Sequence, residues 1–347
     1  MSDILLRELS NPDIDWLVTH GQRQQLSDSE ALIEPGQLLD SLYLLLEGNL
    51  AVHSSDGDGE VARLSRGELI GEGWLFNTTP VVSVVTVEQA LVLTIPKHEL
   101  TGKLQQDVGF AAHFYRALAL IMSERIRRLF EQSELLRYQS GQMVKEALFV
   151  FGELHDSDIH WMMSAGRVEK LAAGRVLLHA GRPVDALYTV LDGQLAIATT
   201  DRPCDPLSLC FHGLEQHGAT QNFKPIAYIS RGGLPGIISF LDFQPLPVRI
   251  HAEDDSLLLA IPRQQVAIKL QEDLAFAARF YRVIATQMAN LLSAVVSVEK
   301  DPDRGSLSSA LDDELDVGEL QRVSEGGTKF DWMLKHLGVG SRGVGSR

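Results

Sequence analysis

The feature that most constrains this chain is an internal repeat. The run Asp-Ile-Asp-Trp at 13–16 recurs 145 positions later as Asp-Ile-His-Trp at 158–161. The offset has grown to 166 where Ile-Pro at 95–96 recurs at 261–262. The second copy therefore carries an insert, which we place near 201–225. A repeat this long is a duplicated domain, because each copy can bury a core of its own.

Within each copy the pattern reads helix, then short strands, then helix. In the first copy, two apolar runs within 42–52 are separated by Gly48, which predicts a strand pair with a tight turn. The β-branched residues at 83–87 and the apolar run at 90–95 predict further strands. From about Thr101 the apolar spacing becomes helical. Short strands with glycine turns and flanking helices predict an α+β fold with a barrel or jelly roll in each copy.

The repeat and the change in composition at its end divide the chain into four parts. The first copy occupies 1–130, and a connecting helix is expected over 131–155. The second copy occupies 156–297. The remainder, 298–347, begins as an acidic linker and ends in two copies of Gly-Val-Gly-Ser-Arg, which we expect to be flexible.

The last part of the chain also predicts a short helix over 328–337. Thr328 and Asp331 resemble a capping box, and Gly338 is typical of a helix stop. A helix this short is marginal alone in water, so it docks either on its own domain or in a groove of a protein partner. Its apolar stripe, the candidate partner-docking face, consists of Phe330, Met333, Leu334 and Leu337.

Composition limits the partners and the compartment. The net charge of −15 opposes binding to nucleic acid or to an anionic membrane surface. No run of about 18 apolar residues occurs, so no membrane span is expected, and the first residues lack the pattern of a signal peptide. The two cysteines suit a reducing compartment. We expect a cytoplasmic protein that binds no DNA.

These motifs resemble the cyclic-nucleotide-binding domain family, which includes bacterial catabolite activators and the regulatory subunits of cyclic-AMP-dependent kinase. The resemblance covers about 1–130 and 150–297 and implies two tandem β-rolls with flanking helices. A pair of such domains without an output domain also resembles a cyanobacterial family named for its association with bacteriocin-type transport. A homodimer is an alternative, because in this family the helix after the roll often pairs two protomers. The matching residues are 42–48, Gly67, Gly71, Glu72, Pro80, Ile95 and Pro96.

The resemblance implies a phosphate-binding cassette, which reads Gly-Glu, seven or eight residues, then Pro-Arg-Ala/Ser. In the family the glutamate accepts hydrogen bonds from the ribose 2′-hydroxyl, and the arginine holds the cyclic phosphate. Here the arginine position is Val81 in the first copy and Leu246 in the second, and Ile237 replaces the glutamate in the second copy. The candidate ligand residues of the first copy are Gly71, Glu72, Pro80, Val81, Val82 and Ser83. The degenerate pocket of the second copy consists of Gly236, Ile237, Pro245 and Leu246.

A buried phosphate without a cationic partner is costly. We therefore expect pockets that bind cyclic AMP or cyclic GMP weakly or not at all, and no cofactor. The chain is then a non-enzymatic regulatory or docking protein, since it contains no nucleophile elbow, HExxH, P-loop or dinucleotide fingerprint. The alternatives are a cyclic nucleotide sensor acting through the first copy, and a sensor of a different small ligand in the same pocket.

Two further clusters each allow two interpretations. One group of cysteines and histidines in the insert could bind zinc or could be incidental residues of a loop. The spacing of these residues favours the loop. The basic run 124–128 contacts nucleic acid or is a solvated helix face with ion pairs to Glu131 and Glu134, and the second is favoured. The group in the insert consists of Cys204, Cys210, His212 and His217.

Overall fold

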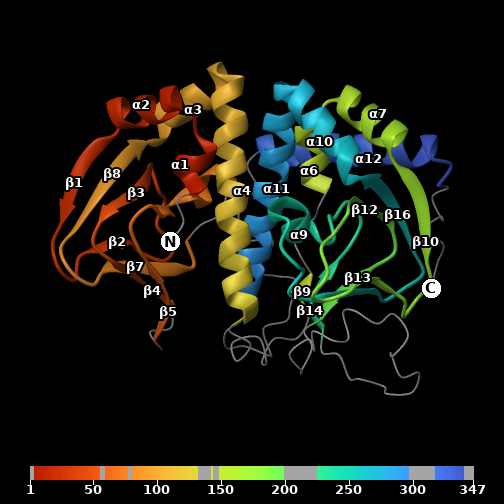
Figure 1. Cartoon of the computed structure of the whole chain (residues 1–347), viewed down its shortest axis with the longest axis horizontal. Coiled ribbons are helices and arrows are strands. Elements are labelled where there is room, and N and C mark those ends of the chain that lie inside the picture. Colours follow the sequence, from red (N-terminus) through yellow and green to blue (C-terminus); the bar gives the residue numbers. More distant parts are fainter. Residues whose placement is uncertain are drawn as a thin grey trace. The chain divides into compact units, whose positions relative to one another are not determined.

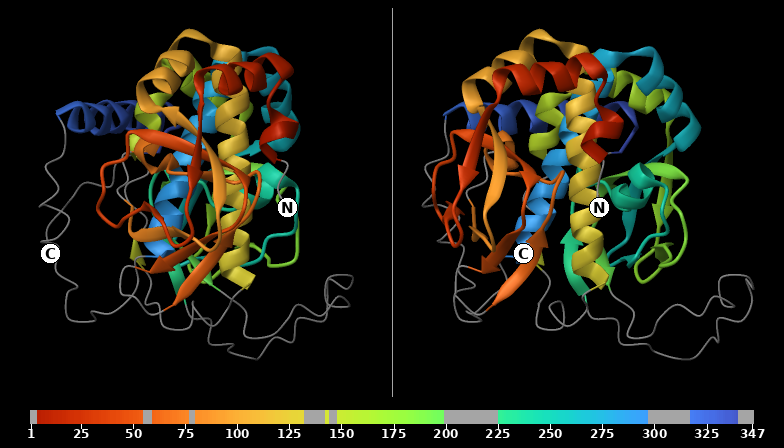
Figure 2. Two further views of the ribbon diagram at one scale, coloured as in Figure 1. Left: turned by 90° about the vertical axis from the view of Figure 1, so that its left-hand side faces the viewer. Right: turned by 60° about the vertical axis from the view of Figure 1, so that its left-hand side comes forward.

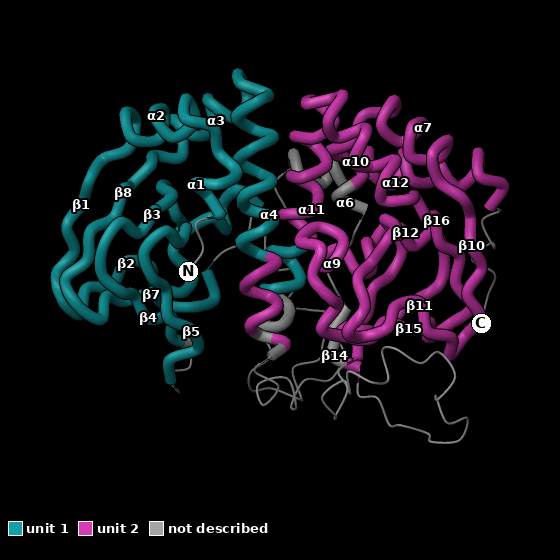
Figure 3. The backbone as a smooth tube through the Cα atoms, viewed as in Figure 1, with its two compact units in different colours: residues 1–122, 288–297 teal, residues 123–287, 298–347 magenta. Residues whose placement is uncertain are grey.

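The chain forms two compact units, shown in Figure 3. Each contains one copy of the repeat, here called roll one and roll two. The predicted boundary at 130 falls inside a helix, α4 (Val108–Glu131), which like α11 (Leu274–Val296) is divided between the units. Unit 1 consists of residues 1–122 and 288–297, and unit 2 of residues 123–287 and 298–347. This computed structural model describes residues 4–54, 59–76, 80–131, 142–143, 148–198, 225–296 and 317–339.

Roll one is built from two antiparallel sheets of four strands each, in the orders β1-β8-β3-β6 and β2-β7-β4-β5 (Figure 1). Their inner faces enclose a core of leucine, isoleucine and valine side chains. The strands are β1 (Gln22–Leu26), β2 (Ala31–Ile33), β3 (Ser41–Glu47), β4 (Leu50–Ser54), β5 (Glu60–Leu64), β6 (Leu69–Ile70), β7 (Val82–Thr86) and β8 (Ala90–Pro96).

Roll two repeats this plan in sheets of order β10-β16-β12 and β11-β15-β13-β14-β9. All described pairings are antiparallel except that of β9 with β14. The strands are β9 (Gln142–Met143), β10 (Arg167–Leu171), β11 (Val176–Leu178), β12 (Ala186–Asp192), β13 (Leu195–Ala198), β14 (Pro225–Ile229), β15 (Arg249–Ala252) and β16 (Ser256–Pro262).

The two rolls share their strand register, which confirms the predicted duplication. Leu42 pairs with Ile95 in roll one, and Leu187 pairs with Ile261 in roll two. Each central strand then shifts register shortly before a glycine at φ +88, Gly48 or Gly193. A Cβ at either glycine would lie 2.8 Å from a backbone carbonyl oxygen, so the repeated turn requires glycine.

Helices flank both rolls, as the α+β prediction required. In roll one, α2 and α3 lie together over one end of the strands (Figure 2). Around roll one the helices are α1 (Ile4–Glu8), α2 (Asn11–His20), the short 3₁₀ helix η1 (Glu72–Phe76), α3 (Lys97–Gln106) and α4. Around roll two they are α6 (Leu148–Glu153), α7 (Asp156–Ala165), α9 (Ile237–Asp242), α10 (Arg263–Glu272), α11 and α12 (Val317–His336).

The predicted connecting helix over 131–155 is wrong as a single helix. Within that range the strand β9 precedes the six-residue helix α6. The backbone of Gln142–Met143 is extended because it pairs in parallel with Ala227 and Tyr228 of β14. Sheet hydrogen bonds to a distant strand therefore override the local helical pattern.

The same pair of hydrogen bonds to an aspartate occurs in both units, where a short helix ends and a long helix begins. Asp107 accepts hydrogen bonds from Lys103 Nζ at 2.7 Å and from the Phe110 N–H at 3.0 Å, at the start of α4. Asp273 receives the same two bonds at 2.8 Å each, at the start of α11. The lysine ammonium, followed by the backbone N–H, holds the pKa of both carboxyls below its usual value. The carboxylate thus caps the long helix and fixes its direction.

A second repeated carboxylate has different partners in the two rolls. Asp13 at the start of α2 receives Ser10 Oγ at 2.6 Å and lies 2.8 Å from Nδ1 of His113. Its counterpart Asp158 is held by both Nε and Nη2 of Arg279, at 2.7 and 2.9 Å. Burial alone would raise the pKa of Asp13, but the hydrogen bonds from Ser10 and His113 outweigh it and lower that pKa. The carboxylate form of Asp13 therefore stabilises the fold.

We expect Asp13→Asn to lower the free energy of unfolding of roll one by about 1–3 kcal/mol at pH 7. Because the folded-state pKa of Asp13 is depressed, this stabilisation is present above about pH 4 and is lost as the pH falls through the folded-state pKa. Urea unfolding of both proteins at pH 7 and pH 3 measures the difference. Asp15→Asn, on the exposed face of the same helix, is the control. A difference that stayed constant with pH would contradict the assignment.

The terminal helix is longer than predicted and docks on its own unit. It begins at Val317 and not at Thr328, whose hydroxyl donates to Ser324 O at 2.9 Å inside the helix. The expected capping box is therefore wrong. Of the predicted partner-docking face, Leu337 is half-buried and the rest is almost fully buried, with Phe330 edge-on to Phe151 of α6 at 5.0 Å. The almost fully buried residues are Phe330, Met333 and Leu334.

Three predictions fall on residues outside the described ranges. They concern the insert with its cysteines and histidines (Cys204, Cys210, His212 and His217), the acidic linker up to 316, and the glycine-rich end from 340. Among the residues that are described, no three histidine, cysteine or acidic side chains gather as a metal site. Within the same residues, every helix is too short or too polar to cross a lipid bilayer.

Candidate ligand site

The cassette of roll one begins with a tight turn against β3. Gly71 has φ +86, which other residues rarely adopt. A Cβ at this glycine would lie 3.1 Å from the carbonyl oxygen of Ser41 and 3.3 Å from Cδ2 of Tyr43. Glu72 follows as the first residue of η1 and is half-buried. The predicted Gly71–Glu72 pair thus lies at the wall of the roll.

The other end of this cassette runs into β7. The carbonyl oxygen of Pro80 accepts a hydrogen bond from the Gly36 N–H at 2.8 Å. Val81, at the arginine position, is 37% exposed, and the half-buried Val82 and Ser83 begin the pairing with β4. Valine has no donor to offer a phosphate. Pro80, Val81, Val82 and Ser83 thus supply no cation at this end of the cassette.

The interior beneath this cassette is apolar. Trp74 of η1 packs against the core, and the Lys97 ammonium lies 5.2 Å from the centre of its ring. A phosphate buried here would lose its water and gain apolar neighbours in exchange. The buried core residues are Leu26, Leu32, Ile33, Leu39, Leu45, Leu50, Leu64, Ile70, Val84, Ala90 and Val92.

The cassette of roll two is packed more tightly than that of roll one. Gly236 has φ +76, and a Cβ there would lie 2.4 Å from Cδ1 of Leu178 and 3.1 Å from Cγ2 of Val184. Ile237, which replaces the glutamate, is 6% exposed. The cassette helix α9 turns a continuous buried face inward, made of Ile237, Ile238, Ser239 and Phe240.

The downstream half of this cassette is shifted by one residue relative to the sequence alignment. The Gly181 N–H donates to the carbonyl oxygen of Leu246 at 2.8 Å, as the Gly36 N–H does to that of Pro80. By this bond Leu246 corresponds to Pro80, and Pro247 takes the arginine position. The reason is that α9 has six residues where η1 has five. Leu246 is 2% exposed, whereas the preceding Pro245 is exposed.

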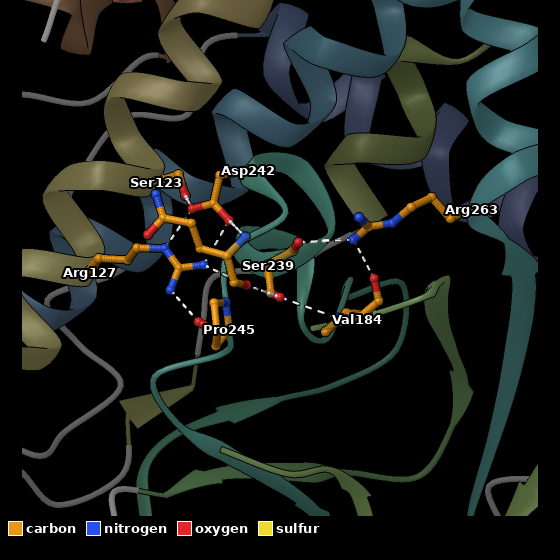
Figure 4. A network of polar contacts seen from close by, with 8 residues as sticks. Ser123, Arg127, Val184, Ser239, Asp242, Pro245 and Arg263 are labelled. Atoms are coloured by element: carbon orange, nitrogen blue, oxygen red, sulfur yellow. Dashed lines mark hydrogen bonds and ion pairs between the residues drawn. The ribbon is translucent and has the colours of Figure 1, made fainter. Parts of the chain in front are cut away.

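A polar network ties this cassette to its surroundings (Figure 4). Nη2 of Arg263 donates to the carbonyl oxygens of Val184 and Ser239, the latter at 3.0 Å. The same guanidinium lies over the rings of Phe240 and Phe243, at 5.0 and 4.1 Å. Burial lowers the pKa of Arg263, although nearby carboxylates oppose the effect. These contacts give Nη2 of Arg263 and the carbonyl oxygens of Val184 and Ser239 partners within unit 2.

Arg127 of α4 holds the end of the same cassette. Its Nε and Nη2 donate to the two carboxylate oxygens of Asp242 at 2.5 and 2.7 Å, and Nη1 donates to Pro245 O at 2.6 Å. Ser123 Oγ donates to Asp242 Oδ2 at 2.8 Å. The prediction of a solvated face is wrong for Arg127, which is 8% exposed. It holds for Arg128, which pairs with Glu124 on the surface.

A shallow groove lies elsewhere on roll one, beside α3. Its lining includes Asp40, Lys97 and His98, but neither Gly71 nor Glu72. The groove is therefore distinct from the cassette. No residue predicted for the ligand site contributes to it.

The chain is similar in sequence to curated bacterial regulators. The chain is 22% identical over 202 residues to the cAMP-activated global transcriptional regulator CRP of Haemophilus influenzae, covering 51% of this chain and 89% of the relative. It is 32% identical over 69 residues to the Pasteurella multocida protein of the same name, covering 19% and 33%. The chain thus spans most of one relative and about a third of the other.

Solved structures with similarity include the regulatory domain of Toxoplasma gondii PKA with cAMP, at 15% identity and a TM-score of 0.29, covering 78% of this chain and 92% of that one. The regulatory subunit of a cAMP-independent protein kinase A from Trypanosoma cruzi, bound to guanosine, has 16% identity and a TM-score of 0.28, covering 78% and 80%. The sequence model of the cyclic nucleotide-binding domain matches residues 23–107 and 168–273, more than half of the chain. With one match in each roll, this chain belongs to the cyclic nucleotide-binding domain family.

Proposed function

We propose that this chain is a non-enzymatic regulatory or docking protein, acting in the cytoplasm through a protein partner and not through DNA, whose second roll has no ligand site. The observation that carries the proposal is the packed cassette of roll two. Ile237 replaces a ligand-binding carboxylate and is 6% exposed, and Leu178 and Val184 crowd the glycine turn. A roll that fills its own pocket retains its value as a scaffold while losing the capacity to bind a nucleotide.

The charge balance of roll one supports the same proposal. A cyclic phosphate is held in proteins by charge-assisted bonds, best supplied by the fork of an arginine. Val81 and Val82 offer none, and the core beneath is apolar. Roll one is therefore proposed to bind cyclic AMP and cyclic GMP weakly or not at all.

A second candidate is a sensor that acts through roll one. It is favoured by Gly71 and Glu72, which keep the family pair in a left-handed glycine turn beside β3. The ligand would be a cyclic nucleotide held without arginine, or a small molecule without a phosphate. Both versions place the same carboxylate, Glu72, on the ligand.

Calorimetric titration with cyclic AMP and cyclic GMP tests the proposal. We expect no heat of binding from roll two and a dissociation constant for roll one no tighter than about 100 μM. Val81→Arg should tighten binding at roll one at least tenfold, because it adds a guanidinium to a cassette that already contains Glu72. Adding Glu72→Ala to this variant should remove the gain.

A substitution in the packed cassette of roll two, one residue before the position that corresponds to Val81, serves as the control. Leu246→Arg should give no nucleotide binding and should destabilise unit 2, because it buries a charge where the side chain is 2% exposed. Sub-micromolar binding by the unaltered protein, abolished by Glu72→Ala, would establish the sensor and reject the docking proposal.

A further inference from the structure

Arg127 and Asp242 form a buried charged pair within unit 2. The guanidinium makes a two-point bond to the carboxylate and also donates to the carbonyl oxygens of Pro245 and Gln244, at 2.6 and 3.2 Å. Both side chains are 10% exposed. A buried arginine with its donors shared between a carboxylate and two carbonyls is held in one geometry.

This pair connects α4 to the whole downstream end of the cassette. Asp242 also accepts from the Gln244 N–H at 3.0 Å, and Ser239 Oγ donates to Gln244 O. The Val184 N–H in turn donates to Ser239 Oγ at 3.2 Å. The bonds therefore run from α4 through α9 to the segment before β12, as Figure 4 shows.

The residue enclosed by these bonds is in a strained conformation. Phe243 has φ +60, in the left-handed region that bulky side chains seldom occupy, and is 68% exposed. Its neighbours Asp242 and Gln244 both accept hydrogen bonds from Arg127, as does Pro245. Arg127 thus bonds to the residue before Phe243 and to the residue after it. Loss of these bonds would allow the backbone of Phe243 to leave the left-handed region.

The sequence of roll one does not repeat this pair of residues. The residue of α11 that corresponds to Arg127 at the offset of 166 is Ser293, which has no guanidinium. Neither of the residues that align with Asp242, Phe76 and Asn77, is acidic. The pair is a specialised feature of roll two and not a general requirement of the roll.

We propose that the end of α4 is a built-in latch for the cassette of roll two, in which Arg127 sets the cassette conformation that a ligand sets elsewhere. The position of α4 then controls α9 and the strained Phe243, and a change in α9 acts back on α4. This inference does not depend on whether roll one binds a ligand.

Amide hydrogen exchange on the full chain tests the latch in both directions. Arg127→Met should raise exchange at least tenfold at the amides of Phe243, Gln244 and Leu246, because their hydrogen bonds lie in the held segment. Asp242→Asn should raise exchange in residues 123–131 of α4, since coupling is reciprocal. The double variant should be no worse than either single one.

Arg128→Met is the matched control, one position along the same helix in an exposed pair, and should leave the cassette amides unchanged. If Arg127→Met fails to fold, Arg127→Lys keeps the charge without the fork and should give an intermediate rise. An equal rise throughout β10 and β16 in the Arg127 variant, or unchanged exchange of α4 in Asp242→Asn, would reduce the pair to an ordinary structural contact and overturn the proposal.

Discussion

Replacing Arg279 by methionine is expected to lower the free energy of unfolding of unit 2 by about 3–5 kcal/mol, because it leaves a buried carboxylate without its cation. Asp158 is 2% exposed and receives two bonds from Arg279, at 2.7 and 2.9 Å. Methionine keeps an unbranched apolar side chain, so the loss arises from the missing charge. For a unit of this size the Tm should fall by on the order of 10 °C in a thermal unfolding experiment.

Roll one supplies the control for this experiment at the corresponding position. His113→Met removes the partner of Asp13, but His113 is 40% exposed at its side chain and Asp13 keeps its bonds to Ser10. The expected cost is about 1 kcal/mol or less. Equal losses of Tm in the two variants would contradict this expectation. They would show that the exposure of Arg279 or His113 does not determine how much its bond to the aspartate stabilises the fold.

Phe330→Ala should detach the terminal helix. The Phe330 ring is 1% exposed and lies edge-on to Phe151, so truncation removes a buried aromatic contact worth about 3–5 kcal/mol. The ammonium of the neighbouring Lys329 donates to Leu154 O at 2.8 Å, but this single part-buried hydrogen bond does not replace the area that the ring buries. Exchange of the α12 amides should rise at least a hundredfold, and the Tm of unit 2 should fall.

Two comparisons make this result specific. Asp331→Ala changes an exposed residue of the same helix and should alter neither quantity. Deleting 317–347 should lower the Tm at least as much as Phe330→Ala, because it uncovers Phe151 and Leu154 on unit 2. An unchanged Tm after deletion would favour the interpretation that this helix serves a partner protein.

The rolls could be predicted from sequence because their determinants repeat. Leu42 and Leu187, and the glycines that follow them, recur at one offset, and a recurring residue is visible without any structure. The absence of the cassette arginine was equally visible, because the family cassette places that arginine at a known distance along the chain from the glycine. Sequence reasoning placed Leu246 one residue away from its structural position, because a six-residue helix and a five-residue 3₁₀ helix look alike as apolar runs.

The latch could not be predicted in this way. Arg127 and Asp242 lie 115 positions apart and neither belongs to a repeated motif. In the sequence, Arg127 is one of three arginines in a run of five residues, with nothing to distinguish the buried one. The terminal helix was predicted too short because Thr328 and Asp331 suggested a capping box. Docking on α6 outweighs the propensity cost of Gly326 and Gly327 inside the helix.

The two donors of α4 that reach Asp242 set the rotation of that part of the helix about its own axis. Ser123 and Arg127 are four positions apart, so their side chains leave the same face of the helix one turn apart. Both bond to Asp242 Oδ2, from Ser123 Oγ at 2.8 Å and from Arg127 Nε at 2.5 Å. A rotation by one residue, about 100°, would turn both donors away from the carboxylate together, so a single aspartate fixes which face of this segment points toward the cassette.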